Sequence, residues 1–401
     1  MFKNRKIFKR PDIVAAFVFG LLIVLSHMLI HPGQRDDVWF AEVLNDKTLP
    51  EYLAYRYEVW TARLLIEITL AVFTRNLIVW RIVNVFAILL LGYSFSKIND
   101  FKHSEFMFVA LCFFPWTFMR ETGWATTFIC YIWPFACGVW SLSVLKELYE
   151  QKKVSGFRML LAFLAFIYAV NFEQVLVLFF CILVYVLIRC IYEKATHAIM
   201  PVVILLAVEM GMLCFSLTCP GNASRTMLES AAHMPEFTGF NLINKAVLGL
   251  NSTFISFSHK DPVPFLFFAV VFVYALKRKR KLSFILNLAA AAYYTAIFAL
   301  TAMHLFKYSG DDLRLTGAYL FFIANLCYVV IVLLTLMFLT DRVEENLLLC
   351  TVFGAGMLTR VMMGFSPTCF MSGQRTYTYV DFGMLFVTVR LMLNLCEKNH
   401  E

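Results

Sequence analysis

Apolar runs of about 20 residues recur along the whole sequence, and they constrain the fold more than any other feature. A helix of about 20 residues crosses a hydrocarbon core of about 30 Å. With 61% hydrophobic and only 15% charged residues, the chain carries more apolar surface than a soluble domain could bury. We therefore expect an all-α fold, a polytopic transmembrane helical bundle of about 12 spans. These expected spans cover residues 12–30, 77–96, 104–119, 127–146, 157–170, 174–190, 198–217, 262–276, 282–303, 315–339, 345–363 and 379–395.

The net charge of +8 indicates orientation in the membrane rather than nucleic-acid binding. Lys and Arg gather at the ends of the spans, as in the block 277–281, and cytoplasmic loops are enriched in these residues. If residues 59–76 form an amphipathic interfacial helix rather than a span, the basic loops and both termini share the cytoplasmic side. We expect one integral domain of the cell membrane, residues 1–401, whose outer loops 31–76 and 218–261 form the active-site face.

Two adjacent acids, Asp36 and Asp37, follow the first span and stand beside Arg35. A carboxylate in this place can act as a general base toward an incoming hydroxyl group. A pair of carboxylates can also hold a divalent cation, Mg²⁺ or Mn²⁺. A solvated helix end explains the same residues, and the sequence does not tell which acid is the base. Both acids are therefore candidate catalytic residues, and a cation is permitted but not required.

Two aromatic segments carry candidate substrate-binding residues. Trp60 and Arg63 are three residues apart and share one face of a helix, where an arginine can hold a lipid phosphate. Arg120, Trp124 and Tyr131 could bind a sugar, because a sugar ring stacks on aromatic faces and its hydroxyl groups hydrogen bond to polar side chains. An ordinary aromatic belt with snorkelling cations is the alternative for both segments.

Glu173 follows Asn171 in a tight turn between two apolar runs. Ionisable groups at such depth are costly, which makes Glu173 a candidate for function. Helix capping, or an ion pair with Arg120 or Arg225, would also account for it. The Pro-Gly-Asn turn that precedes Arg225 would present Asn222 and this arginine to an anion.

Arg314 and Arg375 are two further arginines on the expected outer side. Together with Arg63, Arg120 and Arg225 they could converge on one phosphate group. Each of them alone is more easily explained as a charge at a helix end. All five lie on the side that the positive-inside rule does not enrich, and this makes the set a candidate anion site.

The order of these motifs resembles that of a largely uncharacterised family of bacterial multi-spanning proteins, which is itself similar to the GT-C glycosyltransferases. The shared order is the double acid, the Trp-x-x-Arg helix, Thr-Gly-Trp ahead of Tyr131, then Asn-x-Glu and Pro-Gly-Asn-x-x-Arg. One position departs from the family pattern, because Ala62 stands where a glycine is expected before Arg63.

The resemblance implies a GT-C-like fold and an inverting hexosyl transfer from a polyprenyl-phosphate-linked sugar. The implied acceptor is a cell-envelope polysaccharide, lipid or teichoic-acid-type polymer, and the implied partners are this donor, this acceptor and membrane lipid, with no nucleic acid. Two alternatives stay open: a transporter or flippase of a lipid-linked glycan, and an envelope polysaccharide polymerase or ligase. In the family pattern Asp36 or Asp37 is the base, and the site is lined by Trp60, Arg63, Asn171, Glu173, Asn222 and Arg225.

Overall fold

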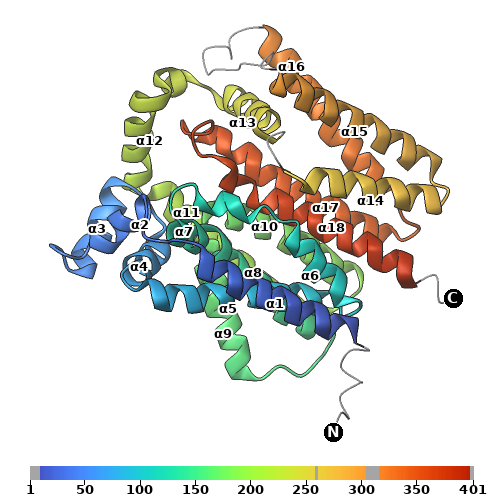
Figure 1. Ribbon diagram of the computed structural model, residues 1–401, viewed down its shortest axis with the longest axis horizontal. Coiled ribbons are helices and arrows are strands. Elements are labelled where there is room, and N and C mark those ends of the chain that lie inside the picture. Colours follow the sequence, from blue (N-terminus) through green and yellow to red (C-terminus); the bar gives the residue numbers. More distant parts are fainter. Residues whose placement is uncertain (1–9, 258–260, 304–315, 398–401) are drawn as a thin grey trace. The chain divides into compact units, whose positions relative to one another are not determined.

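The computed structural model describes residues 10–257, 261–303 and 316–397. Every regular element in these ranges is a helix, which confirms the all-α prediction (Figure 1). The chain forms two compact units, unit 1 (Met1–Ser224) and unit 2 (Arg225–Glu401), and each unit has its own set of packed helices.

Nine helical segments of the described chain are long and apolar enough to cross a membrane, so the protein is a multi-pass membrane protein, as the sequence predicts. Three other expected spans fall on shorter helices, α6 (Ser104–Cys112), α9 (Gly156–Val170) and α14 (Val263–Lys277). A helix of 15 residues, such as α9, advances about 22 Å, which is less than the hydrocarbon core. The nine long segments are Pro11–Leu29, Leu77–Ile98, Trp124–Tyr149, Glu173–Tyr192, Thr196–Thr218, Lys281–Ala302, Gly317–Met337, Val343–Phe365 and Gln374–Cys396.

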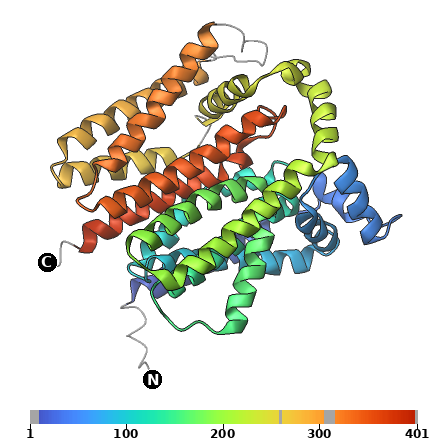
Figure 2. The ribbon, with the colours of Figure 1, turned by 180° about the vertical axis from the view of Figure 1, so that it is seen from behind.

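The core of unit 1 is a continuous helical run from Trp124 to Tyr149. It begins as α7 (Trp124–Thr127), passes through a π-helical turn, η3 (Phe128–Ile132), and continues as α8 (Trp133–Tyr149). Helix α8 is largely buried because it packs between α5 and α9, and α1 packs on α6. Helix α10 lies beside α11, as Figure 2 shows. The long helices around it are α1 (Pro11–Leu29), α5 (Leu77–Ile98), α10 (Glu173–Tyr192) and α11 (Thr196–Thr218).

Three short helices connect α1 to α5. They are α2 (Asp36–Glu42), α3 (Leu49–Val59) and α4 (Leu64–Phe73), and a 3₁₀ helix, η2 (Trp116–Arg120), later precedes α7. Helix α4 has 10 residues and a length of about 15 Å, so it is a short apolar helix like α9 and α14, and the interfacial placement of 59–76 stays a prediction.

Unit 2 begins with α12 (Pro220–His233), whose first turn still belongs to unit 1, and η4 (Pro235–Gly239). Helix α14 packs against α15 and α18, and α17 packs against α18 along its length. Two 3₁₀ helices, η6 (Met362–Phe365) and η7 (Gln374–Tyr377), precede α18. The remaining helices are α13 (Leu242–Phe257), α15 (Lys281–Ala302), α16 (Thr316–Met337), α17 (Val343–Val361) and α18 (Thr378–Glu397).

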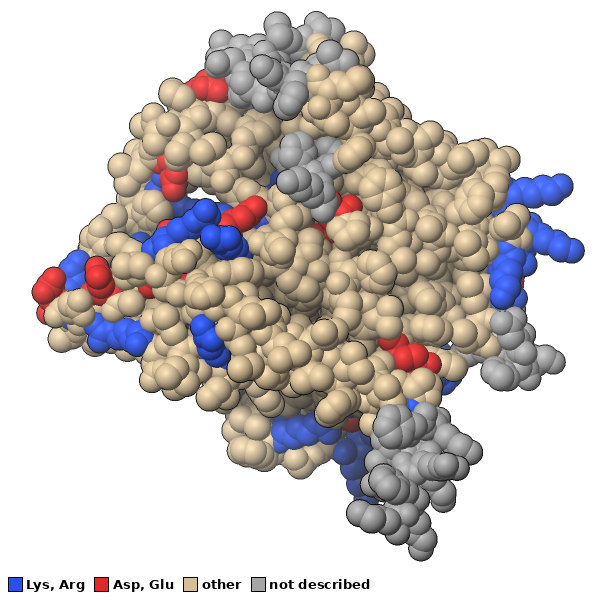
Figure 3. Space-filling view, in the orientation of Figure 1, with Lys and Arg blue, Asp and Glu red and all other residues tan. Residues whose placement is uncertain are grey.

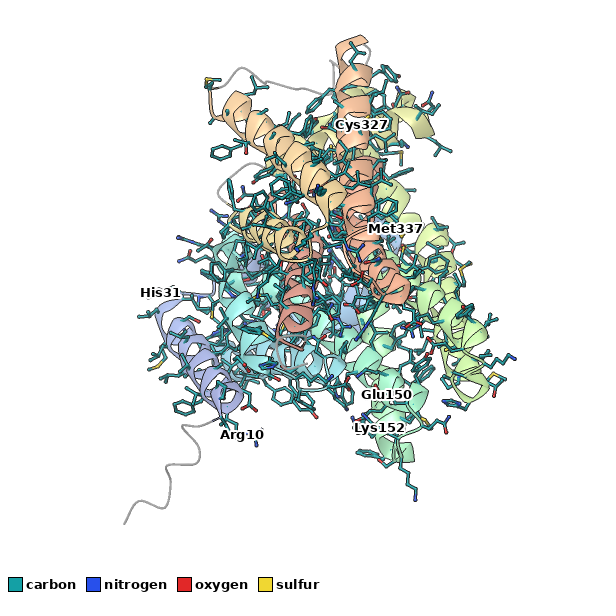
Figure 4. All side chains as sticks on the ribbon, turned by 90° about the vertical axis from the view of Figure 1, so that its right-hand side faces the viewer. Arg10, His31, Glu150, Lys152, Cys327 and Met337 are labelled. Carbon is teal, nitrogen blue, oxygen red and sulfur yellow. The ribbon has the colours of Figure 1, made fainter. Side chains whose placement is uncertain are left out.

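On the face drawn in Figure 3, the charged side chains form a few separate groups with broad uncharged areas between them. In unit 1, Arg10 lies at the same end as Glu150 and Lys152, whereas His31 follows the other end of α1 (Figure 4). Glu150 accepts from Lys152 at 2.6 Å and from Lys146 at 2.8 Å, which neutralises part of this charge. The start of α1 and the loop after α8, both expected on the cytoplasmic side, thus lie at the same end of unit 1.

Candidate functional site

Asp37 caps the start of helix α7. Its carboxylate accepts from the main-chain N–H groups of Thr126 at 2.7 Å, Ala125 at 3.2 Å and Gly33 at 3.0 Å. The hydroxyl group of Thr126 donates to the same carboxylate at 2.8 Å, and Asp37 is only 1% exposed. Because the first N–H groups of a helix have no acceptor within the helix, this distant carboxylate satisfies them. The role seen in the structure is therefore to position α7.

Gly123 makes this cap possible. It has a φ of +125°, a backbone conformation that favours glycine. A Cβ atom at this position would lie 2.4 Å from Oδ1 of Asp37 and 2.8 Å from the carbonyl oxygen of Gln34. The glycine of the Thr-Gly-Trp motif is thus required by the approach of Asp37.

Asp36 is the first residue of α2 and is exposed. Its main-chain N–H donates to the carbonyl of Thr122 at 2.9 Å, and the guanidinium group of Arg35 donates to the carbonyl of Glu121. These contacts hold the start of α2 against the loop that precedes α7. Of the two adjacent acids, Asp36 has the solvent-accessible side chain and Asp37 the buried one.

Asn171 caps α4 in the same way. Its Oδ1 atom accepts from the main-chain N–H groups of Leu65 at 3.0 Å and Ile66 at 3.3 Å, in the first turn of α4. Ala62, at the position where the family pattern has glycine, is 3% exposed, and its carbonyl accepts from Nδ2 of Asn171 at 3.5 Å. The Asn-x-Glu turn is therefore fixed against the segment that carries Arg63.

Arg63 and Glu173 form an ion pair. Nε of Arg63 donates to Oε2 of Glu173 at 2.5 Å, and the guanidinium carbon lies 4.5 Å from the ring centre of Phe172. Burial lowers the pKa of Arg63, but the carboxylate of Glu173, together with the neighbouring Cys130 and Tyr131, raises it by more, so the net pKa of the arginine is raised. The side chains keep 28% and 25% of their surface exposed, so the pair is open to a ligand. The sequence favours Arg120 or Arg225 as the partner of Glu173, whereas the structure places Arg63 there.

A second ion pair lies nearby, and the sequence analysis does not identify it. Arg56 donates to both carboxylate oxygens of Glu67, at 3.0 and 2.9 Å, and the two side chains are 8% and 5% exposed. The hydroxyl of Tyr52 also donates to Glu67, and burial together with this carboxylate raises the pKa of Tyr52. The guanidinium of Arg56 faces Trp39 and Trp60, 5.1 and 5.4 Å from their ring centres. The sequence signal for this pair is Glu67, a charge inside the otherwise apolar α4.

The Pro-Gly-Asn turn packs against the segment that holds Trp60. A Cβ atom on Gly221 would lie 2.5 Å from the main-chain nitrogen of Trp60 and 2.6 Å from the carbonyl oxygen of Tyr57, so glycine is needed there. The amide group of Asn222 donates to the carbonyl of Ser216 at 2.7 Å. Asn222 thereby holds the end of α11 against the start of α12.

Most of the predicted residues of unit 1 belong to one connected set. The ring of Phe172, which contacts Arg63, meets the ring of Tyr131 edge-on with centroids 4.9 Å apart. Tyr131 lies in η3, which continues the helix that Asp37 caps, and Trp39 of α2 faces Arg56. We call this set the motif cluster. It comprises Asp36, Asp37, Trp60, Arg63, Tyr131, Asn171 and Glu173.

Other predicted residues lie elsewhere. Arg120 ends η2 and is exposed, and Trp124 is half-buried and stacks on a ring of η3. Arg225 and Arg375 belong to unit 2, in α12 and η7, and Arg314 lies outside the described residues. The convergence of five arginines on one phosphate stays a prediction.

The motif cluster does not fit a preformed divalent metal site. Among the residues with described positions, no three His, Cys, Asp or Glu side chains come together in a way that could hold a metal ion. The oxygens of Asp37 already accept N–H and O–H donors, which a cation would have to displace. A role for Mg²⁺ or Mn²⁺ therefore stays a prediction.

Comparison with protein-family models, curated proteins and solved structures gives no match for this chain. Its class is defined by its own fold, that of an all-helical, multi-pass membrane protein. Within that class, unit 1 carries an exposed carboxylate, a partly exposed arginine and several aromatic rings in one cluster.

Proposed function

We propose that the protein is a membrane glycosyltransferase of GT-C type. It transfers a sugar from a polyprenyl-phosphate-linked donor to a cell-envelope acceptor on the extracytoplasmic face. The observation that carries the proposal is the motif cluster, in which residues of four separate sequence motifs are linked through side-chain and main-chain contacts. A cluster of this composition offers a base for a hydroxyl group, an arginine for a phosphate and aromatic rings for a sugar.

Asp36 is the proposed general base. Each oxygen of Asp37 already accepts hydrogen bonds, and the side chain is buried as the cap of α7, away from an incoming hydroxyl group. Asp36 is exposed on the neighbouring position and can reach an acceptor hydroxyl group. The acceptor oxygen attacks the anomeric carbon, its proton passes to Asp36, and the bond from that carbon to the phosphate oxygen breaks with inversion.

Arg63 is the proposed ligand of the phosphate that leaves. Its Nε binds Glu173, and within the described chain its two terminal nitrogens, Nη1 and Nη2, make no hydrogen bond. A guanidinium held at one edge in this way can donate from the other edge to phosphate oxygens. Glu173 orients the arginine, and Asn171 fixes the helix start that carries it.

The aromatic residues are the proposed sugar-binding surface. Trp124 is half-buried at the start of α7, and Tyr131 follows two helical turns later. Since Asp37 caps α7 and also belongs to α2, the same contact sets the position of these rings and of Asp36.

The proposed topology places both termini in the cytoplasm and the motif cluster outside. Termini on one side require an even number of crossings. The proposal therefore counts the three shorter helices, α6 with η2, α9 and α14, as crossings in addition to the nine long ones found in the described chain. This gives 12 spans in the proposed bundle.

The test is transfer of labelled hexose from polyprenyl-phosphate donors by the protein in liposomes, with an envelope extract as acceptor. We expect Asp36→Asn to abolish transfer, and Asp46→Asn, an exposed acid of the same loop, to leave it unchanged. Full activity of Asp36→Asn would exclude this residue as the base. Movement of labelled lipid across the membrane without transfer would favour the flippase, and addition of whole glycan chains would favour the polymerase or ligase.

A further inference from the structure

Unit 2 contains two buried aspartates that the sequence analysis does not single out. Asp261 precedes α14 and Asp381 lies in the first turn of α18, and they are 6% and 0% exposed. The carboxyl oxygens of Asp381 receive no N–H or O–H donor from the residues that the structure describes. The carboxyl groups of Asp381 and Asp261 lie close enough for their side chains to interact. Two carboxyl groups can share a hydrogen bond only when one of them carries a proton.

Asp261 is held in place by the main chain. Its Oδ1 atom accepts from the N–H of Val263 at 2.9 Å, at the start of α14. Burial raises the pKa of Asp261, because removal from water disfavours the charged form more than the Val263 N–H favours it. Asp261 is thus fixed at the start of α14, with its carboxyl group near that of Asp381.

Arg360, in the last turn of α17, is the cation beside this pair. It is 1% exposed, and its guanidinium donates to the hydroxyl groups of Thr376 and Tyr377 and lies 3.9 Å from the ring centre of Tyr377. It attracts Asp381 electrostatically, and its Nε has no partner in the described chain. The arginine therefore compensates one negative charge without fixing the carboxyl group by a hydrogen bond.

A tyrosine that packs among other aromatic rings lies near the pair. Tyr294 of α15 is 2% exposed, lies within electrostatic range of both aspartates, and has a hydroxyl group that meets no partner among the described residues. Its ring packs edge-on against Phe257 and Phe265, and Tyr328 of α16 lies close to it. The charged groups around the pair are thus two acids and one arginine, in the part of unit 2 with known positions.

We propose that Asp261 and Asp381 form a binding site for a single proton beside Arg360. One proton makes the cluster neutral, because it leaves one carboxylate, one carboxylic acid and one guanidinium group. Without that proton, two carboxylates would face each other in a site that excludes water, and an uncompensated buried charge is costly. Its loss would push the start of α18 away from the start of α14, two helices that pack against each other. The site thereby couples the packing of unit 2 to pH.

An infrared pH titration of the full-length protein in liposomes, with ¹³C-labelled aspartate, tests the proposal. We expect a protonated aspartic-acid band that persists above about pH 5, where ordinary aspartates are ionised, and disappears at higher pH as one site. Asp261→Asn and Asp381→Asn should each remove the whole band, because an amide replaces the shared proton as donor. Glu236→Gln, an acid of η4 outside the pair, should leave it unchanged.

Three results would overturn the proposal. The first is a wild-type spectrum without such a band, a measurement that needs no variant to fold. The second is loss of only half of the band in each single variant, which would indicate two separately protonated acids. The third is recovery of thermal stability at high pH on addition of Na⁺ or Ca²⁺, because the site would then bind a metal cation in place of the proton.

Discussion

The carboxylate of Asp37 lies 2.7 Å from the main-chain nitrogen of Thr126, a residue 89 positions further along the chain. This contact makes a loop acid the cap of a helix that belongs to the core of unit 1. The cap explains why Asp37 is buried and why position 123 is a glycine, and it leaves the neighbouring Asp36 exposed.

Asp37→Ala should destabilise unit 1 because it leaves the N–H groups of Thr126 and Ala125 buried without an acceptor. An unsatisfied buried group costs about 1–3 kcal/mol, so we expect a clear fall of the thermal midpoint in detergent. Asp46→Ala, at an exposed acid of the same loop, should keep the wild-type midpoint. Equal midpoints for the two variants would contradict the capping role of Asp37.

The buried pair of Arg56 and Glu67 gives a second stability prediction. Arg56→Met leaves the carboxylate of Glu67 buried without its cation, which should cost about 3–5 kcal/mol. The double variant Arg56→Met/Glu67→Met removes both charges and should recover most of this loss. Denaturation of the wild type, Arg56→Met, Glu67→Met and the double variant measures the loss of stability and its recovery. A double variant as unstable as Arg56→Met would show that the charges are needed.

Asn171 should act on α4 through its side-chain oxygen. Asn171→Ala removes the acceptor for the N–H groups of Leu65 and Ile66, and loss of a helix cap costs about 0.5–2 kcal/mol. Asn171→Asp keeps an oxygen at the same place and should retain the cap. The thermal midpoints of the two variants check this, and equal losses in both would argue against capping.

The apolar runs are sufficient to predict the helices of this chain and its membrane class. Their lengths are less predictable, because a run such as 157–170 has the composition of a span although α9 ends after 15 residues. The end of α9 is set by Asn171, which binds α4, and by Glu173, which binds Arg63. These partners are more than 100 residues away in the sequence, so a local sequence pattern does not predict the contacts.

The chemistry of the motif residues is also only partly readable from their types. Asp36 and Asp37 are equivalent in the sequence, and the structure separates them because Asp37 binds the start of α7, where Gly123 leaves room for it, whereas Asp36 is exposed. The pair of Asp261 and Asp381 has no sequence signal, since each acid appears as an ordinary charge near a helix start. Such sites are defined by burial, which a sequence pattern does not give.

Arg63→Lys tests the proposed phosphate ligand. Lysine keeps the positive charge but has one nitrogen, which cannot bind Glu173 and present a second edge to a phosphate. We expect kcat for sugar transfer to fall by about 10²–10³-fold, the usual cost of losing a donor that stabilises developing charge. The midpoint of thermal unfolding serves as the control for folding. Wild-type kcat in a folded Arg63→Lys protein would remove Arg63 from the proposed mechanism.

The number of crossings can be tested at α9, because its two ends lie on opposite faces only if this helix crosses. An epitope inserted at Lys153 should be cytoplasmic in the proposed topology, together with one inserted at Lys279, whereas an epitope at Asp46 should be outside. A further epitope at Lys194, an exposed residue after the long helix α10, completes the test, because Lys153 and Lys194 lie on the same side only if α9 crosses as well as α10. A cytoplasmic location of both epitopes makes α9 a crossing despite its 15 residues. Locations on opposite sides would reduce the count of crossings and place the two termini differently.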